Sequence, residues 1–358
     1  MRRERLLDLM ERFGKLRIAV MGDLFLDRWL TIDPGLDEPS LETGLTAWQV
    51  VESRRCAGAA GTVLNNLSAL GIGKLYAISL LGLDGEGVEV KRALCERCVD
   101  TSLLVESGLI VTPAYVKPMF MQPDGTLAEG NRMDHKNRKP TPRQLENALL
   151  ERLRDVAGQV DAIILLDQLT EENTGVLTQA VREAAAQLGR EHPELLLFAD
   201  SRAFIDRFHD VVIKCNNLEA AALTGLPGGE PFRSEDVFAA LDALSARTGG
   251  QVVVTCNAHG VAVRDGGRPV LIPAAKQEGP IDVCGAGDAC TAGVVSALCA
   301  GASPSEAALM GNLCSGVTVR KLDTTGTASQ AEALALYDEQ FASEAGKALS
   351  CPFVSVKG

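Results

Sequence analysis

The sequence predicts an α/β fold with a mostly parallel central sheet, helices on both faces of that sheet, and a small accessory group of strands. Three observations point to this class. Short aliphatic runs, such as those at 161–167 and 195–200, alternate with amphipathic stretches, which is the order of βαβ units. The runs are apolar throughout, as in parallel strands covered on both sides. The chain has 35 glycines and only 4% aromatic residues, which suits many tight turns and aliphatic strands.

The elements of this fold can be placed along the chain. Leu6, Leu7, Met10 and Phe13 recur at helical spacing, so an amphipathic helix should lead into the first strand. Strands are then expected at 15–22, 45–54, 75–81, 161–167, 195–200, 211–214 and 251–255, with a hairpin at 261–264 and 269–272. Helices are expected at 57–70, 84–98, 142–156, 171–188, 217–223, 234–247 and 305–320.

Two interrupted segments break the alternation. Residues from about 31 to 55 and from about 106 to 133 are polar or rich in strand formers, and Pro113, Pro118 and Pro123 punctuate the second segment. No linker or internal repeat separates them from the rest. We therefore expect one domain over 1–358, with these segments inserted as a small lid of β-strands.

Bulk composition excludes several functions. The formal net charge of −12 disfavours binding to nucleic acid or to an anionic membrane surface. No segment is apolar enough to span a membrane, and no secretory leader is visible. Ten cysteines are scattered through mostly apolar segments, as in a reducing compartment, and the Cys95-x-x-Cys98 pair lacks partners for a metal. A cytoplasmic protein is expected.

The most informative stretch is Asp282-Val-Cys-Gly-Ala-Gly-Asp288, which runs into an apolar helix. The first N–H groups of a helix lack intrahelical partners and lie at the positive end of its dipole, so Gly285, Ala286 and Gly287 can form a cradle for a phosphoryl group. Asp288 beside this cradle can take the proton from an attacking hydroxyl. The stretch predicts phosphoryl transfer to an alcohol. The alternative is an ordinary helix-capping carboxylate. The stretch fits neither a Walker A loop nor a dinucleotide fingerprint.

Several motifs together resemble the PfkB-type carbohydrate kinases of the ribokinase-like superfamily, over about residues 15–330. The stretch 282–288 resembles the family's D-T-x-G-A-G-D signature, and Asn216-Asn-Leu-Glu219 resembles its N-x-x-E motif. Residues 57–60 (AGAA) resemble its N-terminal glycine signature, and 252–261 (VVVTCNAHGV) its nucleotide-side turn. Within the family, 22–29 (GDLFLDRW) and 132–134 (RMD) resemble the heptose-phosphate kinase domain of bifunctional ADP-heptose synthases. The cytidylyltransferase motif of those proteins is absent from these 358 residues, so a stand-alone kinase is expected.

The resemblance implies a role for each matching residue. Asp288 would be the general base, with the turn of Gly285, Ala286 and Gly287 holding the transition-state charge. Asn216 and Glu219 would organise Mg²⁺ beside the phosphates of ATP, with Glu219 acting through water. For Asn216 and Glu219 the alternative is a polar helix start with an exposed glutamate.

Further residues are assigned to the two substrates. Asp27 and Gly58 would face the sugar, and Arg132 would bind a substrate phosphate, although Asp27 could be a surface residue and Arg132 a solvated strand residue. The nucleotide would be lined by four residues: Thr255, Asn257, Gly260 and Asn312. Asn312 is either a nucleotide contact or a polar group in helix packing.

Four positions depart from the family pattern: Gly61 replaces an Asn, Asn257 a Gly, Cys284 a Thr, and Ser201-Arg202 a Pro-Lys pair. The sugar pocket is therefore altered, and a heptose phosphate is in doubt as the acceptor. The expected function is ATP-dependent phosphorylation of a sugar or sugar phosphate. The alternatives are a nucleoside kinase on the same fold and a non-catalytic regulatory relative. The resemblance also leaves open a monovalent cation and a homodimer formed through the lid.

Overall fold

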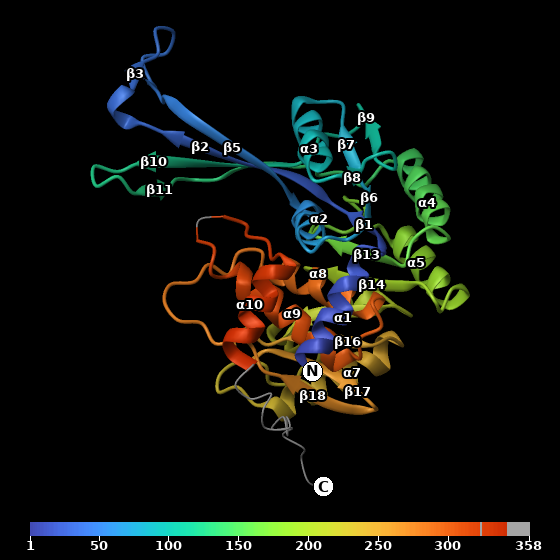
Figure 1. Cartoon of the computed structure of the whole chain (residues 1–358). Coiled ribbons are helices and arrows are strands. Elements are labelled where there is room, and N and C mark those ends of the chain that lie inside the picture. Colours follow the sequence, from blue (N-terminus) through green and yellow to red (C-terminus); the bar gives the residue numbers. More distant parts are fainter. Residues whose placement is uncertain (323, 342–358) are drawn as a thin grey trace.

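The computed structural model describes residues 1–322 and 324–341. Residue 323 and residues 342–358 of the expected domain lie outside the described part. A nine-stranded sheet forms the centre of the molecule, with the strand order β18-β17-β16-β15-β14-β13-β1-β6-β8 (Figure 1). Their bounds are β1 Arg17–Gly22, β6 Lys74–Ile78, β8 Val99–Asp100, β13 Ala162–Asp167, β14 Leu196–Ser201, β15 Val212–Asn216, β16 Val252–Thr255, β17 Val261–Asp265 and β18 Arg268–Ile272.

The strands from β16 to β8 pair in parallel, and only β17 and β18 run antiparallel at one edge. Alternate side chains of a strand point to opposite faces, so a strand covered on both sides supplies two cores. In β1, Ile18 and Val20 join one hydrophobic core, whereas Ala19 and Met21 join the other. The continuous apolar runs of the sequence are explained by this two-sided burial.

Helices cover both faces of the sheet. One core includes residues of α1 (Arg3–Phe13), α2 (Ala60–Ala69), α8 (Ala286–Cys299), α9 (Pro304–Thr318) and α10 (Gln330–Phe341). The other includes residues of α4 (Arg143–Ala157), α5 (Gln179–Glu191), α6 (Asn217–Thr224) and α7 (Ser234–Thr248). Within the described part of the chain, every helix is too short or too polar to span a lipid bilayer.

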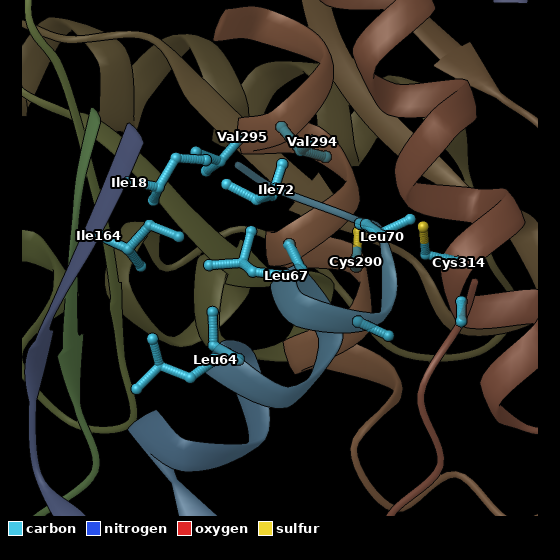
Figure 2. Close-up of a cluster of buried hydrophobic side chains, with 14 of the residues drawn as sticks. Ile18, Leu64, Leu67, Leu70, Ile72, Ile164, Cys290, Val294, Val295 and Cys314 are labelled. Atoms are coloured by element: carbon cyan, nitrogen blue, oxygen red, sulfur yellow. The ribbon is translucent and has the colours of Figure 1, made fainter. Parts of the chain in front are cut away.

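Helix α8 is fixed on both sides by close packing. Figure 2 shows Leu64 and Leu67 of α2 pointing toward Ile18 and Ile164 of the sheet, with Val295 of α8 in the same cluster. On the other side α8 meets α9 at glycines: a Cβ on Gly293 would lie 2.8 Å from the Cys314 sulfur. Because glycines let the backbones of α8 and α9 approach closely, the start of α8 is held in a defined place over the sheet.

A second, smaller sheet extends away from the large one, beyond α8 and α10 (Figure 1). It has the order β11-β10-β2-β5, with β12 paired to β10. Helix α3 (Gly85–Glu96) packs against β2 and β5. The bounds are β2 Leu24–Ile32, β5 Val50–Ala59, β10 Ala114–Met121, β11 Leu127–Glu129 and β12 Met133–His135; short pairs are formed by β3 (Glu38–Pro39) with β4 (Thr46–Ala47) and by β7 (Leu80–Gly82) with β9 (Val105–Ser107).

The small sheet differs in extent from the segments expected from sequence. It begins at Leu24, not near residue 31, because only Asp23 separates the end of β1 at Gly22 from the start of β2. It also extends through Ala59, where a helix was expected. The second segment continues to His135.

The helix expected at 171–188 was also too long: α5 starts at Gln179, after a loop. In that loop the Val176 N–H donates to the Asp23 carboxylate at 2.9 Å. Asp23, which is distant in sequence, thus stabilises the loop conformation of a segment that the local sequence pattern predicts to be helical.

Candidate active site

The glycine turn before α8 has the shape that the sequence motif predicted. Gly285 caps the helix in the left-handed region, with φ of 78°, where residues with a Cβ are strained. A Cβ on Gly285 would also lie 2.8 Å from a methyl carbon of Thr325, so the turn is crowded as well. The first helical bond runs from Ala289 N–H to the Gly285 carbonyl at 2.9 Å, and the Ala286 N–H donates to the Val283 carbonyl at 3.2 Å. The N–H groups of Gly287 and Asp288 therefore have no partner within the helix.

Beneath this turn lies a buried ion pair that the sequence reading missed. Lys214, in the middle of β15, is 5% exposed, and its Nζ donates to Oδ2 of Asp200 at 2.5 Å. The Thr291 hydroxyl of α8 donates to the same oxygen at 3.1 Å. A Cβ on Gly287 would lie 3.7 Å from the Lys214 Nζ, which places the ammonium directly under the turn. The sequence signal was a lysine ending an aliphatic strand two residues before Asn216.

Asp288 lies in the first turn of α8 and is half-buried. Burial and the negative charge of Asp200 raise the pKa of Asp288 to about 7, while Lys214 and Arg202 oppose the increase. A carboxyl with a pKa near the working pH is suited to accepting a proton, because it is ionised yet basic. Arg202, which stands in the altered Ser201-Arg202 pair, thus acts on the predicted base.

Asp27 and Gly58 lie side by side on neighbouring strands of the small sheet. A Cβ on Gly58 would lie 2.1 Å from Oδ2 of Asp27, so the carboxylate occupies the space that the glycine leaves. Burial raises the pKa of Asp27, while Lys117 and Arg132 oppose it. Asp27 also contributes to the raised pKa of Asp288, so the two carboxylates face a common region.

Arg132 already has partners in the structure. Its guanidinium donates two hydrogen bonds to Asp134, at 2.6 and 2.9 Å, and lies 4.3 Å from the centre of the Tyr115 ring. Lys117 lies over the Trp29 ring at 4.9 Å. These two cations line the same face of the small sheet as Asp27. Lys117 was not singled out from the sequence.

Asn216 and Glu219 form a capping box at the start of α6. The Asn216 side chain accepts from the Glu219 N–H, and the Glu219 carboxylate accepts from the Asn216 N–H, both at 2.8 Å. The capping box matches the polar helix start of the alternative, but Glu219 is half-buried and not exposed, so the role of the two residues beside Mg²⁺ stays a prediction. Burial raises the pKa of Glu219, with Lys214 and Arg202 opposing. Among the described residues no cluster of three or more metal-binding side chains occurs, so the set suits at most a cation held largely by water and phosphate.

The predicted nucleotide residues lie at the end of β16, in the turn from β16 to β17 and, for Asn312, in α9. Thr255 ends β16, and its hydroxyl donates to the Cys215 carbonyl at 3.4 Å. Asn257 has a φ of 48°, a left-handed conformation that Asn tolerates better than most residues, which explains how it replaces the usual glycine. Gly260 has a φ of 111°, and a Cβ there would lie 2.0 Å from the Ile272 carbonyl oxygen. Asn312 donates to the Ile272 and Pro273 carbonyls at 2.8 and 3.0 Å, which ties α9 to the end of β18; its contact with a nucleotide stays a prediction.

Gly61 lies in the first turn of α2. A Cβ at this position would lie 2.5 Å from the Cβ of Ala57, so the Asn found in similar proteins would require β5 to shift.

Comparisons with known proteins show which family the chain belongs to. The model of the pfkB family carbohydrate kinases matches residues 30–331. The chain belongs to this family. It is 29% identical over 313 residues to the bifunctional protein HldE of Caulobacter vibrioides, and 31% identical over 319 residues to that of Caulobacter sp. strain K31. These matches cover 87% of the chain but only 62% and 61% of the two relatives.

Solved structures show the same fold. The ribokinase of Arabidopsis thaliana, determined with ribose and ATP, superimposes with a TM-score of 0.63 at 17% identity over 90% of this chain and 98% of that one. Phosphofructokinase-2 of Escherichia coli, determined with potassium, gives a TM-score of 0.65 at 17% identity over 90% and 99%. The predicted ribokinase-like α/β fold and the resemblance to PfkB-type kinases are confirmed.

Proposed function

We propose that this protein transfers the γ-phosphoryl group of ATP to a hydroxyl of a sugar or sugar phosphate. One observation carries the proposal. Asp288, with a pKa raised to about 7, lies beside the Lys214–Asp200 pair at the start of α8, where the N–H groups of Gly287 and Asp288 have no partner within the helix. A base and preorganised positive charge are what phosphoryl transfer requires, since its catalysis is mostly positioning and charge stabilisation.

The residues divide into three roles. Asp288 accepts the proton of the acceptor hydroxyl, and the turn of Gly285, Ala286 and Gly287 binds the transferring group with Lys214 and Arg202 close by. Asp27 accepts hydrogen bonds from sugar hydroxyls, with Gly58 leaving it room. Asn216 and Glu219 would hold Mg²⁺ through water, and the ion would neutralise charge on the phosphates when bound. Thr255, Asn257 and Gly260 would line the nucleoside.

The small sheet acts as a lid over the sugar in this proposal, excluding water that would otherwise hydrolyse ATP. Its outer part carries exposed apolar side chains, among them Leu36, Leu41, Leu45, Trp48 and Val51. Such side chains favour pairing of two lids in a homodimer. Analytical ultracentrifugation tests this, because a monomer at micromolar concentration would contradict it.

A coupled assay of ADP release over hexoses, pentoses, heptose phosphates and nucleosides tests the function. We expect turnover with a sugar or sugar phosphate. Turnover with nucleosides alone would indicate a nucleoside kinase, and ATP binding without any turnover would indicate a regulatory relative.

Asp27→Ala tests the acceptor side in the same assay. We expect acceptor affinity to fall at least tenfold, because two or more hydroxyl hydrogen bonds to a carboxylate are lost. The affinity for ATP should change less than twofold. Equal losses for both substrates would remove Asp27 from the sugar site.

A further inference from the structure

The structure contains a cavity of about 470 Å³ that is separate from the residues assigned above. Three segments wall it: 109–113 before β10, 135–142 between β12 and α4, and 169–176 before α5. Asp23, Leu24 and Leu80 complete the lining. None of the predicted catalytic, sugar or nucleotide residues belongs to it. Its volume is in the range of small-molecule sites.

The walls are tied together by hydrogen bonds. Asn137 accepts from the Val111 N–H at 3.0 Å and donates to the Val111 carbonyl at 2.8 Å, which joins the first two segments. Thr141 joins the second segment to the third, since its hydroxyl donates to the Gly175 carbonyl at 2.7 Å and its N–H donates to the Asn173 carbonyl at 2.7 Å. The cavity is therefore preformed.

Positive charge gathers at this cavity in a chain whose net charge is −12. The cations Lys136, Arg138 and Lys139 line it, together with the imidazole of His135. In residues 1–322 and 324–341, none of these four side chains forms an ion pair with a carboxylate within 4 Å, in contrast to the nearby Arg132. The start of α4, a helix of 15 residues, also lies here and adds the positive end of its dipole.

The neighbouring carboxylates have other partners. Asp134 is held by Arg132 through two hydrogen bonds. Asp84, which faces His135, accepts from the N–H groups of Gly87 and Thr112. Asp23 accepts from Val176 and Gln168. Glu171, near Lys136, accepts from the Thr170 hydroxyl. The basic side chains thus remain available to a ligand.

We propose that this cavity binds a phosphate monoester with a small carbon body. The phosphate would lie against Arg138 and Lys139, which recognise phosphate by charge and, for Arg, by paired hydrogen bonds. The carbon body would lie against Leu109, Val111 and Leu169. The ligand is either the far end of a phosphorylated acceptor or a separate molecule. Lys136 of the cavity lies 5.8 Å from the centre of the Tyr115 ring, on which Arg132 packs, so the cavity adjoins the part of the small sheet assigned to the acceptor.

The test measures binding of glycerol 3-phosphate to the full chain by ³¹P NMR line broadening, with ADP present to fill the nucleotide site. The double variant R138A/K139A should bind the probe at least fivefold more weakly than wild type. Both side chains are exposed, so folding should persist. The control K15A/R268A removes the same charge at exposed positions outside the cavity and should bind as wild type does. No binding by wild type, or equal binding by R138A/K139A, would overturn the proposal.

Kinetics then distinguish the two sources. If the cavity holds the tail of the acceptor, glycerol 3-phosphate competes with a phosphorylated acceptor, and R138A/K139A raises the KM for that acceptor with kcat unchanged. If it holds a separate molecule, the probe changes the rate without competing. The binding measurement does not depend on kinase activity, so a failure of the proposed function would leave it intact.

Discussion

Two regions of this protein carry the residues proposed for catalysis and for acceptor binding, and they hold their charges in opposite ways. Under the glycine turn, the side chains of Lys214 and Asp200 are only 6% and 16% exposed, and they lie opposite each other on the adjacent strands β15 and β14. On the small sheet, Arg132 and Asp134 are 45% and 24% exposed. Burial strengthens electrostatic interactions, whereas exposed pairs are weakened by water and salt. Under the proposed function, the first region would serve the chemical step and the second the recognition of the acceptor.

Asp288→Asn should give the largest effect. The amide keeps the shape of the side chain but accepts no proton, so kcat should fall about 10²–10⁴-fold. Binding of ATP, measured by calorimetry, and the unfolding temperature should change little. If this variant turns over its substrate as wild type does, the base lies elsewhere.

Lys214→Met tests how strongly the buried pair is held. Without its ammonium, the Asp200 carboxylate is left buried and unpaired, which should cost about 3–5 kcal/mol of unfolding free energy. The double variant D200N/K214M should recover most of this loss in denaturant unfolding, because no charge is then left alone.

The control for this comparison is an exposed pair. Arg190 and Asp210 also form an ion pair, with side chains 57% and 36% exposed. Arg190→Met should cost no more than about 1 kcal/mol. Similar losses for R190M and K214M would mean that burial does not distinguish the two pairs.

The sequence predicted the parts of the site that local backbone determines. The start of α8 and the hairpin turn at Gly260 depend on glycine conformations that can be recognised in a short motif, and the alternating strands follow from hydrophobic pattern. It did not predict the Lys214–Asp200–Thr291 cluster, because these residues come together only when β14, β15 and α8 pack. The loop before α5 was missed for a similar reason: its backbone depends on Asp23, which is far away in the chain.

Gly58→Ala should act on recognition alone. The added methyl would overlap Oδ2 of Asp27 and force the carboxylate away from the sugar, so the acceptor KM should rise more than tenfold while the KM for ATP stays nearly constant. Gly85→Ala is a matched control, because a Cβ there meets nothing within 4 Å. An unchanged acceptor KM in G58A would show that Asp27 does not need its present position.

The pH dependence of kcat/KM links the two kinds of region. Asp288 must be ionised to act as base, so activity should fall by about tenfold per pH unit below its pKa of about 7. Lys214 lowers this pKa and Asp200 raises it. The acidic limb should therefore move to higher pH in K214M and to lower pH in D200N. The titration of ATP is the same in every variant, so a difference between the acidic limbs of K214M and D200N reports the protein group.

The control is Arg132→Ala. It should leave the acidic limb in place, since that exposed cation is not among the groups that shift the pKa of Asp288. If K214M and D200N shift the limb in the same direction, the titrating group is not the carboxyl above the buried pair.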